Sequence, residues 1–196
     1  MIYPTDYGII PTSELNLNKN EVCTRLQTSR DTNLTDFSLL ISELEQNILC
    51  KYSAVRVPVI LKEEDVVDCG FGEVKSVNLF KNLKGCNEAF LFGVTLGINV
   101  DRFLNKLSFT SPASHFIADA LASAYAEAAA DKAEEIIKGN LLCRPRFSPG
   151  YGDLALSCQG AFLERINAQK LLGISLNKSL LMSPAKTITA IVGIEK

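Results

Sequence analysis

The sequence predicts a single α+β domain in which helices cover a mixed or antiparallel β-sheet. The run "EAFLFGVTLG" is continuously apolar between polar flanks, which is typical of a central strand covered on both faces. A long alanine-rich stretch, about His115 to Lys138, predicts the longest helix. The closing segment alternates apolar residues in the manner of a strand, namely Ile188, Ala190, Val192 and Ile194. The chain carries no repeat or low-complexity tract.

Residues 1–30 are polar and irregular, and we expect them to form an N-terminal arm with a short helix around Glu14 to Gln27. Residues 31–196 form the domain itself. Its first helix has apolar residues at helical spacing behind a predicted N-cap at Thr35: Phe37, Leu40, Leu44 and Ile48. The segment "AVRVPVIL" predicts a half-buried strand, and its Pro58 favours an edge position or a bulge.

Shorter elements fill the remainder of the chain. "VVDCGFGEV" indicates a short strand or turn, and a small helix follows from Ser76 to Leu83. Asn99 is the expected cap of a helix that continues through Leu107, and Gly139 is the expected stop of the long helix. Residues 157–172 predict one or two further helices that close at Gly173.

Composition and charge narrow the class of protein. The chain of 196 residues is 47% hydrophobic and 21% charged, as in globular proteins with a buried core. Its formal charge of −2 argues against a dedicated nucleic-acid-binding protein. No apolar run approaches the ~20 residues that span a bilayer. The start "MIYPTDYGIIPT" lacks the features of a signal peptide, so we expect a cytoplasmic protein with no membrane partner.

Catalytic and metal-binding patterns are missing from the sequence. The six cysteines are widely spaced and His115 is the single histidine, so we expect reduced cysteines and no metal site. The sequence has no G-x-S-x-G, P-loop, dinucleotide-binding glycine pattern or H-E-x-x-H. His115 lies at a helix start with no partner for a nucleophile–base pair. We therefore assign no catalytic residue.

The stretch "RPRFSPGYGD", residues 144–153, has the composition of a rigid binding loop. Arg146 offers a planar donor for a carboxylate or phosphate. Pro149 stiffens the chain, Gly150 allows a close approach of the backbone to a ligand, and Tyr151 supplies a flat face with a polar tip. This set suits a small zwitterionic or anionic ligand that carries a ring. An ordinary structured turn is the alternative.

The spacing R-x-x-x-G-Y in this loop resembles the motif of the activation (reactivation) domain of cobalamin-dependent methionine synthase. The resemblance extends over about Leu83 to Ile194. "GCNEAFLFGVTLGINVD" is similar to the family's central strand and turn, and "DALASAYAEAAAD" to its long helix. "NAQKLLGISLNKSLLMSPAKTITAIVGI" is similar to its closing segment. The ordered series implies that fold and a site for S-adenosylmethionine.

The resemblance implies a role for each residue of the loop. Arg146 would hold the carboxylate of S-adenosylmethionine, with Pro149 and Gly150 shaping the backbone and Tyr151 lying against the ligand near the methyl group. Glu127 is the candidate for an acidic helix residue that faces the ligand's ammonium or sulfonium, with Ser123 at the alternative position one turn away. The alternative for Glu127 is a solvated helix face shared with two further acidic residues, Asp131 and Glu134.

Departures from the family pattern shape the expected function. The sequence lacks the D-x-H-x-x-G motif that ligates cobalt. It also lacks the zinc-binding cysteines of a homocysteine site. Its first eighty residues show no counterpart of the acidic residue with which the family contacts the ligand. The resemblance therefore implies an activation subunit, an accessory component rather than a complete enzyme. It would support reductive methylation of cobalamin held by a separate methionine synthase or other corrinoid protein, with a reductant such as flavodoxin or ferredoxin. The alternatives are an S-adenosylmethionine sensor and a structural partner without methyl transfer.

Overall fold

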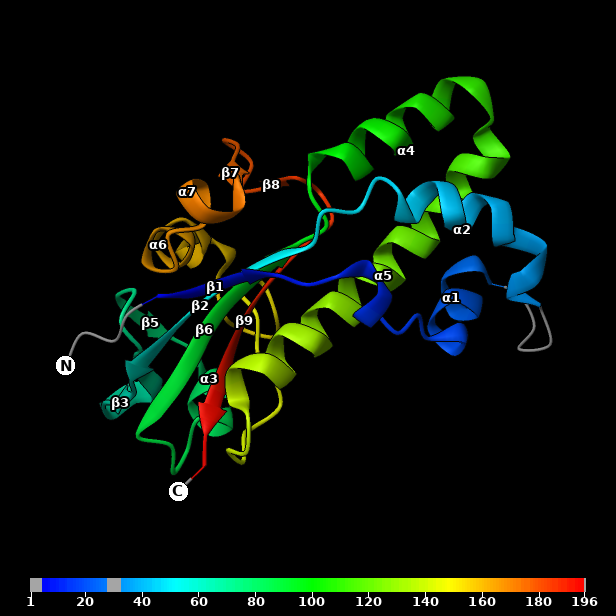
Figure 1. Cartoon of the computed structure of the whole chain (residues 1–196). Helices are drawn as coiled ribbons and strands as arrows, with labels where there is room; N and C mark the ends of the chain where they lie inside the picture. Colours follow the sequence, from blue (N-terminus) through cyan, green and yellow to red (C-terminus); the bar gives the residue numbers. More distant parts are fainter. Residues whose placement is uncertain (1–4, 28–32, 196) are drawn as a thin grey trace.

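The computed structural model describes residues 5–27 and 33–195, and within them the chain has an α+β fold (Figure 1). The main sheet has four strands in the order β1-β2-β6-β9, and each of its pairings is antiparallel. These strands are β1 (Asp6–Ile9), β2 (Lys51–Pro58), β6 (Glu88–Thr95) and β9 (Thr187–Ile194). The predicted fold class is confirmed.

Strand β6 is the centre of the molecule, as predicted for a continuous apolar run. All eight of its residues pair with β2 on one side and with β9 on the other. Because side chains alternate along a strand, Phe90 and Phe92 face one hydrophobic core and Ala89 and Leu91 face a second. The sheet therefore lies between two separate cores.

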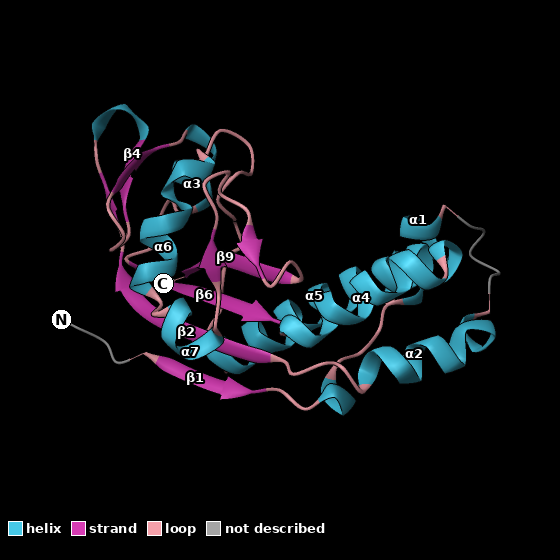
Figure 2. Cartoon of the chain, turned by 90° about the horizontal axis from the view of Figure 1, so that it is seen from above, coloured by secondary structure: helices cyan, strands magenta, loops and turns pink. Residues whose placement is uncertain are grey.

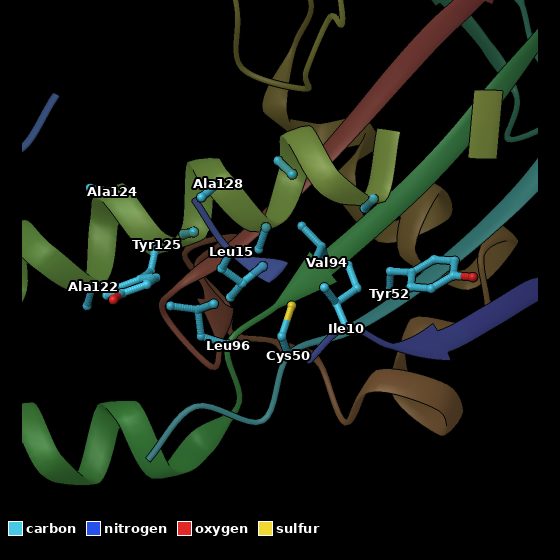
Figure 3. Close-up of a cluster of buried hydrophobic side chains, with 14 of the residues drawn as sticks. Ile10, Leu15, Cys50, Tyr52, Val94, Leu96, Ala122, Ala124, Tyr125 and Ala128 are labelled. Atoms are coloured by element: carbon cyan, nitrogen blue, oxygen red, sulfur yellow. The ribbon is translucent and has the colours of Figure 1, made fainter. Parts of the chain in front are cut away.

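Four helices pack on the first face and extend beyond the sheet as a bundle (Figure 2). They are α1 (Lys19–Leu26), α2 (Ser38–Glu45), α4 (Ile98–Thr110) and α5 (Pro112–Lys138). Helix α5 runs from the bundle back to the sheet (Figure 1), and its alanines let neighbouring elements approach closely. Figure 3 shows Ala122, Ala124, Tyr125 and Ala128 of α5 in this core with Val94 of β6.

The second face is covered by short elements. The helices there are α3 (Val77–Asn82), α6 (Gln159–Arg165) and α7 (Ala168–Leu172), so the predicted region 157–172 forms two helices. A small antiparallel sheet and a hairpin complete this side: β3 (Ile60–Leu61), β4 (Val66–Asp68), β5 (Glu73–Lys75), β7 (Ser175–Leu176) and β8 (Met182–Ser183). Single turns of 3₁₀ helix occur at η1 (Thr12–Glu14), η2 (Leu34–Phe37), η3 (Glu63–Asp65) and η4 (Leu156–Cys158).

The prediction that the strand around Pro58 is half-buried is wrong. Strand β2 lies between β1 and β6, and both of its faces are buried. Within the described residues, β1 pairs with residues 51–54, and Pro58 lies beyond this pairing. No described residue of β1 therefore needs a hydrogen bond from the N–H that Pro58 lacks.

Two predicted helix caps are also wrong. Asn33 rather than Thr35 accepts the capping hydrogen bond, from the Thr35 backbone N–H at 3.2 Å, and the turn η2 precedes α2. Helix α4 begins one residue before Asn99, after Gly97, which has a φ of +90°. Glycine adopts that conformation at low cost, so no side-chain cap is needed to start α4 there.

The segment expected as an N-terminal arm contributes to the same fold. Strand β1 joins the edge of the main sheet, and α1 packs against α5 through Val22 and Leu26 of the first core. The boundary expected at residue 30 lies outside the described residues. No helix within residues 5–27 and 33–195 combines the length and the apolar character needed to cross a membrane.

Candidate functional site

The loop from Arg144 to Leu154 follows the outer edge of β9. The Arg144 N–H donates to the Gly193 carbonyl at 2.8 Å. Phe147 and Ile191 exchange backbone hydrogen bonds of 2.9 and 2.7 Å. This short antiparallel bridge fixes the register of the loop against the sheet. Adjacent residues on extended backbone point to opposite sides, so Arg146 and Phe147 face different ways.

A tight turn follows the bridge. Pro149 is buried, and the backbone N–H of Gly150 donates to the Leu154 carbonyl at 2.9 Å. Gly150 has a φ of +85°, and a Cβ atom there would lie 3.3 Å from the Leu156 Cδ1 atom. The backbone angle therefore favours glycine at this position, and a Cβ atom would also displace the end of the Leu156 side chain slightly.

Asp153 fastens the end of the loop to α3, a contact that the sequence analysis did not identify. Its carboxylate accepts hydrogen bonds from the Ser76 hydroxyl at 2.5 Å and from the N–H groups of Val77 and Asn78 at 2.7 and 3.2 Å. Bonds to Ser76 and to these backbone groups lower the pKa of Asp153 below its ordinary value, although desolvation opposes the shift. The only sequence signal is an aspartate just after the motif.

The guanidinium of Arg146 meets three carboxylates of α5. Its Nη2 lies 3.0 Å from Glu127 Oε2, and its Nη1 lies 2.5 Å from Asp131 Oδ1 and 3.4 Å from Glu134 Oε2. Burial acts to lower the pKa of Arg146, but the hydrogen bond to Asp131 and the three negative charges outweigh it and raise the pKa. Arg146 is therefore a charged, oriented donor in a shielded position.

Of the two candidate positions on α5, Glu127 rather than Ser123 contacts Arg146. Glu127 also lies near α1, where its Oε1 is 3.8 Å from the Nη2 atom of Arg25. Ser123 instead contacts Lys186, whose Nζ lies 2.8 Å from its hydroxyl oxygen. Arg25 was not singled out in the sequence because no local pattern connects α1 to the loop. The alternative for Glu127 was a solvated helix face shared with Asp131 and Glu134. The Asp131 side chain is 71% exposed, but both of these residues contact Arg146.

Tyr151 lies on the other side of the loop from this cluster of charges. Its ring packs edge-on against Phe147, with centroids 6.4 Å apart, and 71% of the residue is exposed. Phe147 in turn packs against the second core. The structure thus brings Glu127 to Arg146, while Pro149, Gly150 and Tyr151 form the adjoining turn.

Metal ligands do not gather within the part of the chain that the structure describes. No group of three His, Cys, Asp or Glu side chains in these residues could hold a metal ion. The six cysteines are unpaired, and four of them are buried. Burial raises the pKa of Cys50 to about 12, so that thiol stays protonated at neutral pH.

Fold and site together define an α+β domain in which a loop on the sheet edge carries an arginine onto the acidic face of a long helix. The sequence matches no protein-family model and no curated protein. Among solved structures, the chain is similar to a crystal structure of the MetH reactivation domain bound to AdoHcy. The TM-score is 0.68 at 13% sequence identity, over 97% of this chain and 78% of that one. The chain therefore has the fold of the methionine synthase reactivation domain.

Proposed function

We propose that this chain binds S-adenosylmethionine beside Arg146 and acts as an activation subunit for cobalamin held by a separate methionine synthase. The observation that carries the proposal is the contact of Arg146 with Glu127, Asp131 and Glu134. The fold adds support, because the similar reactivation domain was crystallised with AdoHcy, which is S-adenosylmethionine without its methyl group.

The charges around Arg146 complement the amino-acid end of this ligand. A guanidinium binds a carboxylate through parallel hydrogen bonds, and neighbouring carboxylates attract an ammonium group. In the free protein, the carboxylates of α5 pair with the guanidinium of Arg146. The ligand's carboxylate would pair with it in the same way. Binding would replace at least one of these contacts, and Asp131 is the simplest to displace because its side chain is 71% exposed. The freed carboxylate and Glu127 would then face the ammonium or the sulfonium.

The turn after Arg146 would complete the contact surface. Pro149 and Gly150 hold the backbone in one conformation, so its polar groups lose little freedom when a ligand binds. Tyr151 is exposed but lies on the other side of the loop with Phe147, so the contact with the methyl group that the resemblance implies for Tyr151 is left out of this proposal. The protein would supply binding and orientation only.

The cobalt would be held by the partner protein. A reductant such as flavodoxin or ferredoxin would give one electron to inactive Co(II), and the Co(I) formed would take the methyl group as its bond to sulfur breaks. Such a reaction needs no acid, base or nucleophile from this chain, because the cofactor supplies the reactivity. A methionine synthase or another corrinoid protein would serve as the partner, through a modest and transient interface.

The decisive experiment follows recovery of an inactivated partner. A cobalamin-dependent methionine synthase without its own activation domain is allowed to accumulate Co(II). The Co(II) absorbance is then recorded with S-adenosylmethionine and a reductant, with and without this protein. We expect faster loss of the Co(II) signal and renewed turnover when the protein is present. Equal rates would contradict activation, and S-adenosylmethionine binding without recovery would favour the sensor alternative.

A further inference from the structure

A pocket lies on the second face of the sheet, among α6, α7 and β7, away from α5 (Figure 1). It has a volume of about 460 Å³, and pockets of roughly 300–1,000 Å³ hold small molecules. Its apolar lining belongs to the second core, whereas Arg146 contacts α5, which packs in the first core. The pocket is therefore separate from the site beside Arg146.

The floor of the pocket is apolar and held in place by the core. Leu163, Ala168 and Ile174 line it, and each of them is at most 7% exposed. All three pack in the second core, so the floor is formed before any ligand binds. Such a floor favours a ligand with an apolar body, because contact with it removes apolar surface from water.

Gly160 leaves the wall of the pocket open on the side of α6. It lies one helical turn before Leu163 and Glu164, so the three residues share one side of α6. A Cβ atom at Gly160 would lie 3.9 Å from the Leu176 Cδ2 atom, and Leu176 lines the pocket from β7. The missing side chain therefore keeps a space between helix and strand, which a larger residue would fill.

The rim of the pocket carries one carboxylate, and charge complementarity selects the ligand. Glu164 is the charged residue among the described residues that line the pocket, and the other polar groups are two amides and a hydroxyl: Asn167, Gln169 and Ser175. Within residues 5–27 and 33–195, the Glu164 carboxylate forms no ion pair or hydrogen bond. A carboxylate with no cation in the same lining attracts a positive charge and repels an anion.

We propose that this pocket binds a small organic cation, namely an amine with an apolar body. The body would lie on Leu163, Ala168 and Ile174, and the ammonium group would pair with Glu164. The amides of the rim would take further hydrogen bonds. This inference goes beyond the proposed function, because it requires neither Arg146 nor a cobalamin-binding partner.

Three probes with the same body test the preference for positive charge: 4-phenylbutylamine, 4-phenylbutanol and 4-phenylbutanoate. Each is titrated at low ionic strength and followed by ligand-observed and protein-observed NMR. The amine should bind about two- to fivefold more tightly than the alcohol, the range for an exposed charge pair, and the carboxylate should bind most weakly. Glu164→Gln should abolish the difference between the amine and the alcohol and leave the affinity for the alcohol unchanged.

Two neighbouring residues of α6 test the position of the site. Gly160→Leu should weaken all three probes about tenfold or more, because its side chain fills the pocket. Gly160→Ala adds a single methyl group to the same wall and should weaken them by a smaller factor. Ala161→Leu is the matched control, since Ala161 is exposed on the same helix but does not line the pocket.

Four results would overturn the inference. They are binding of none of the three probes, a carboxylate affinity that equals the amine's, wild-type binding in Gly160→Leu, and equal losses in Gly160→Leu and Ala161→Leu. If Gly160→Leu does not fold, wild-type binding in Gly160→Ala counts against the site in the same way. Arg146→Ala should leave the amine affinity unchanged, and a loss there would place the amine at the proposed S-adenosylmethionine site instead.

Discussion

Arg146 and Glu127 are 19 residues apart in the sequence, yet their side chains meet at 3.0 Å between Nη2 and Oε2. One comes from a loop on the edge of β9 and the other from the middle of α5. Both side chains are partly shielded, with exposed fractions of 26% and 37%. In the function that we propose, the guanidinium would bind the carboxylate of a zwitterion and the carboxylate would bind its ammonium group.

Replacement of Arg146 by alanine should weaken S-adenosylmethionine binding about ten- to a hundredfold, because a charge-assisted contact contributes about 1.5–3 kcal/mol. Arg144→Ala is the matched control, since Arg144 pairs with Glu195 at 3.2 Å and lies outside the R-x-x-x-G-Y spacing. Isothermal calorimetry on both folded variants measures the difference. Equal losses from the two changes would show that Arg146 is not the specific contact.

Two glycine-to-alanine changes should have opposite effects on stability. Gly150→Ala should destabilise the fold by about 1–2 kcal/mol, because a side chain is strained at a φ of +85°. Gly160→Ala should stabilise it by up to about 1 kcal/mol, since Gly160 lies in α6 and its Cβ would meet nothing nearer than Leu176 at 3.9 Å. Urea unfolding measures both values, and a Gly150 variant as stable as wild type would contradict the argument for a required glycine.

Asp153 should make stability depend on pH in the acid range. Its pKa is lower in the folded chain than the ordinary value of 3.8, so its contribution is complete well above pH 3.8. The contribution is lost as pH falls from that value through the folded pKa. Asp153→Asn should therefore show a smaller loss of stability than wild type between pH 5 and the acid limit of folding. Parallel pH profiles for the two proteins would exclude this role.

The hydroxyl of Tyr125 joins α5 to α2 by donating to Glu45 Oε1 at 2.6 Å. Burial raises the pKa of Tyr125, and the charge of Glu45 raises it further, so the phenol stays protonated. Tyr125→Phe should reduce the free energy of unfolding by about 1.5–3 kcal/mol, the range for a hydrogen bond to a charged group. Chemical denaturation tests this, and Glu45→Gln should cost less because the amide keeps an acceptor. A neutral Tyr125→Phe change would contradict the estimate.

Much of the fold could be predicted because strong local patterns coincide with buried elements. Three elements each follow one pattern along their whole length, and that pattern predicts the element: the apolar run of β6, the alanines of α5 and the alternation in β9. Strand β1 was missed because its four residues, "DYGI", have little buried surface and, among the residues that the structure describes, pair with one strand. Strand β2 was interpreted as half-buried because the local alternation does not show that elements cover both of its faces.

The candidate site was only partly accessible from sequence. Arg146 and the turn through Tyr151 form a compact motif, and Glu127 was selected through the family resemblance. The sequence analysis missed three residues whose partners come near only in the folded chain: Asp153, Arg25 and Lys186. Asp153, for example, lies 77 residues from its partner Ser76 in the sequence. Contacts of this range depend on tertiary packing, which no local spacing encodes.

The central claim is that this chain binds S-adenosylmethionine, and direct titration of the folded wild-type protein tests it most simply. Calorimetry should give a saturable heat with one site per chain, and AdoHcy should compete for that site. A thermal shift that rises with ligand concentration should accompany binding, since a ligand that binds only the folded state stabilises it. A folded protein with no heat, no competition and no thermal shift would contradict the account.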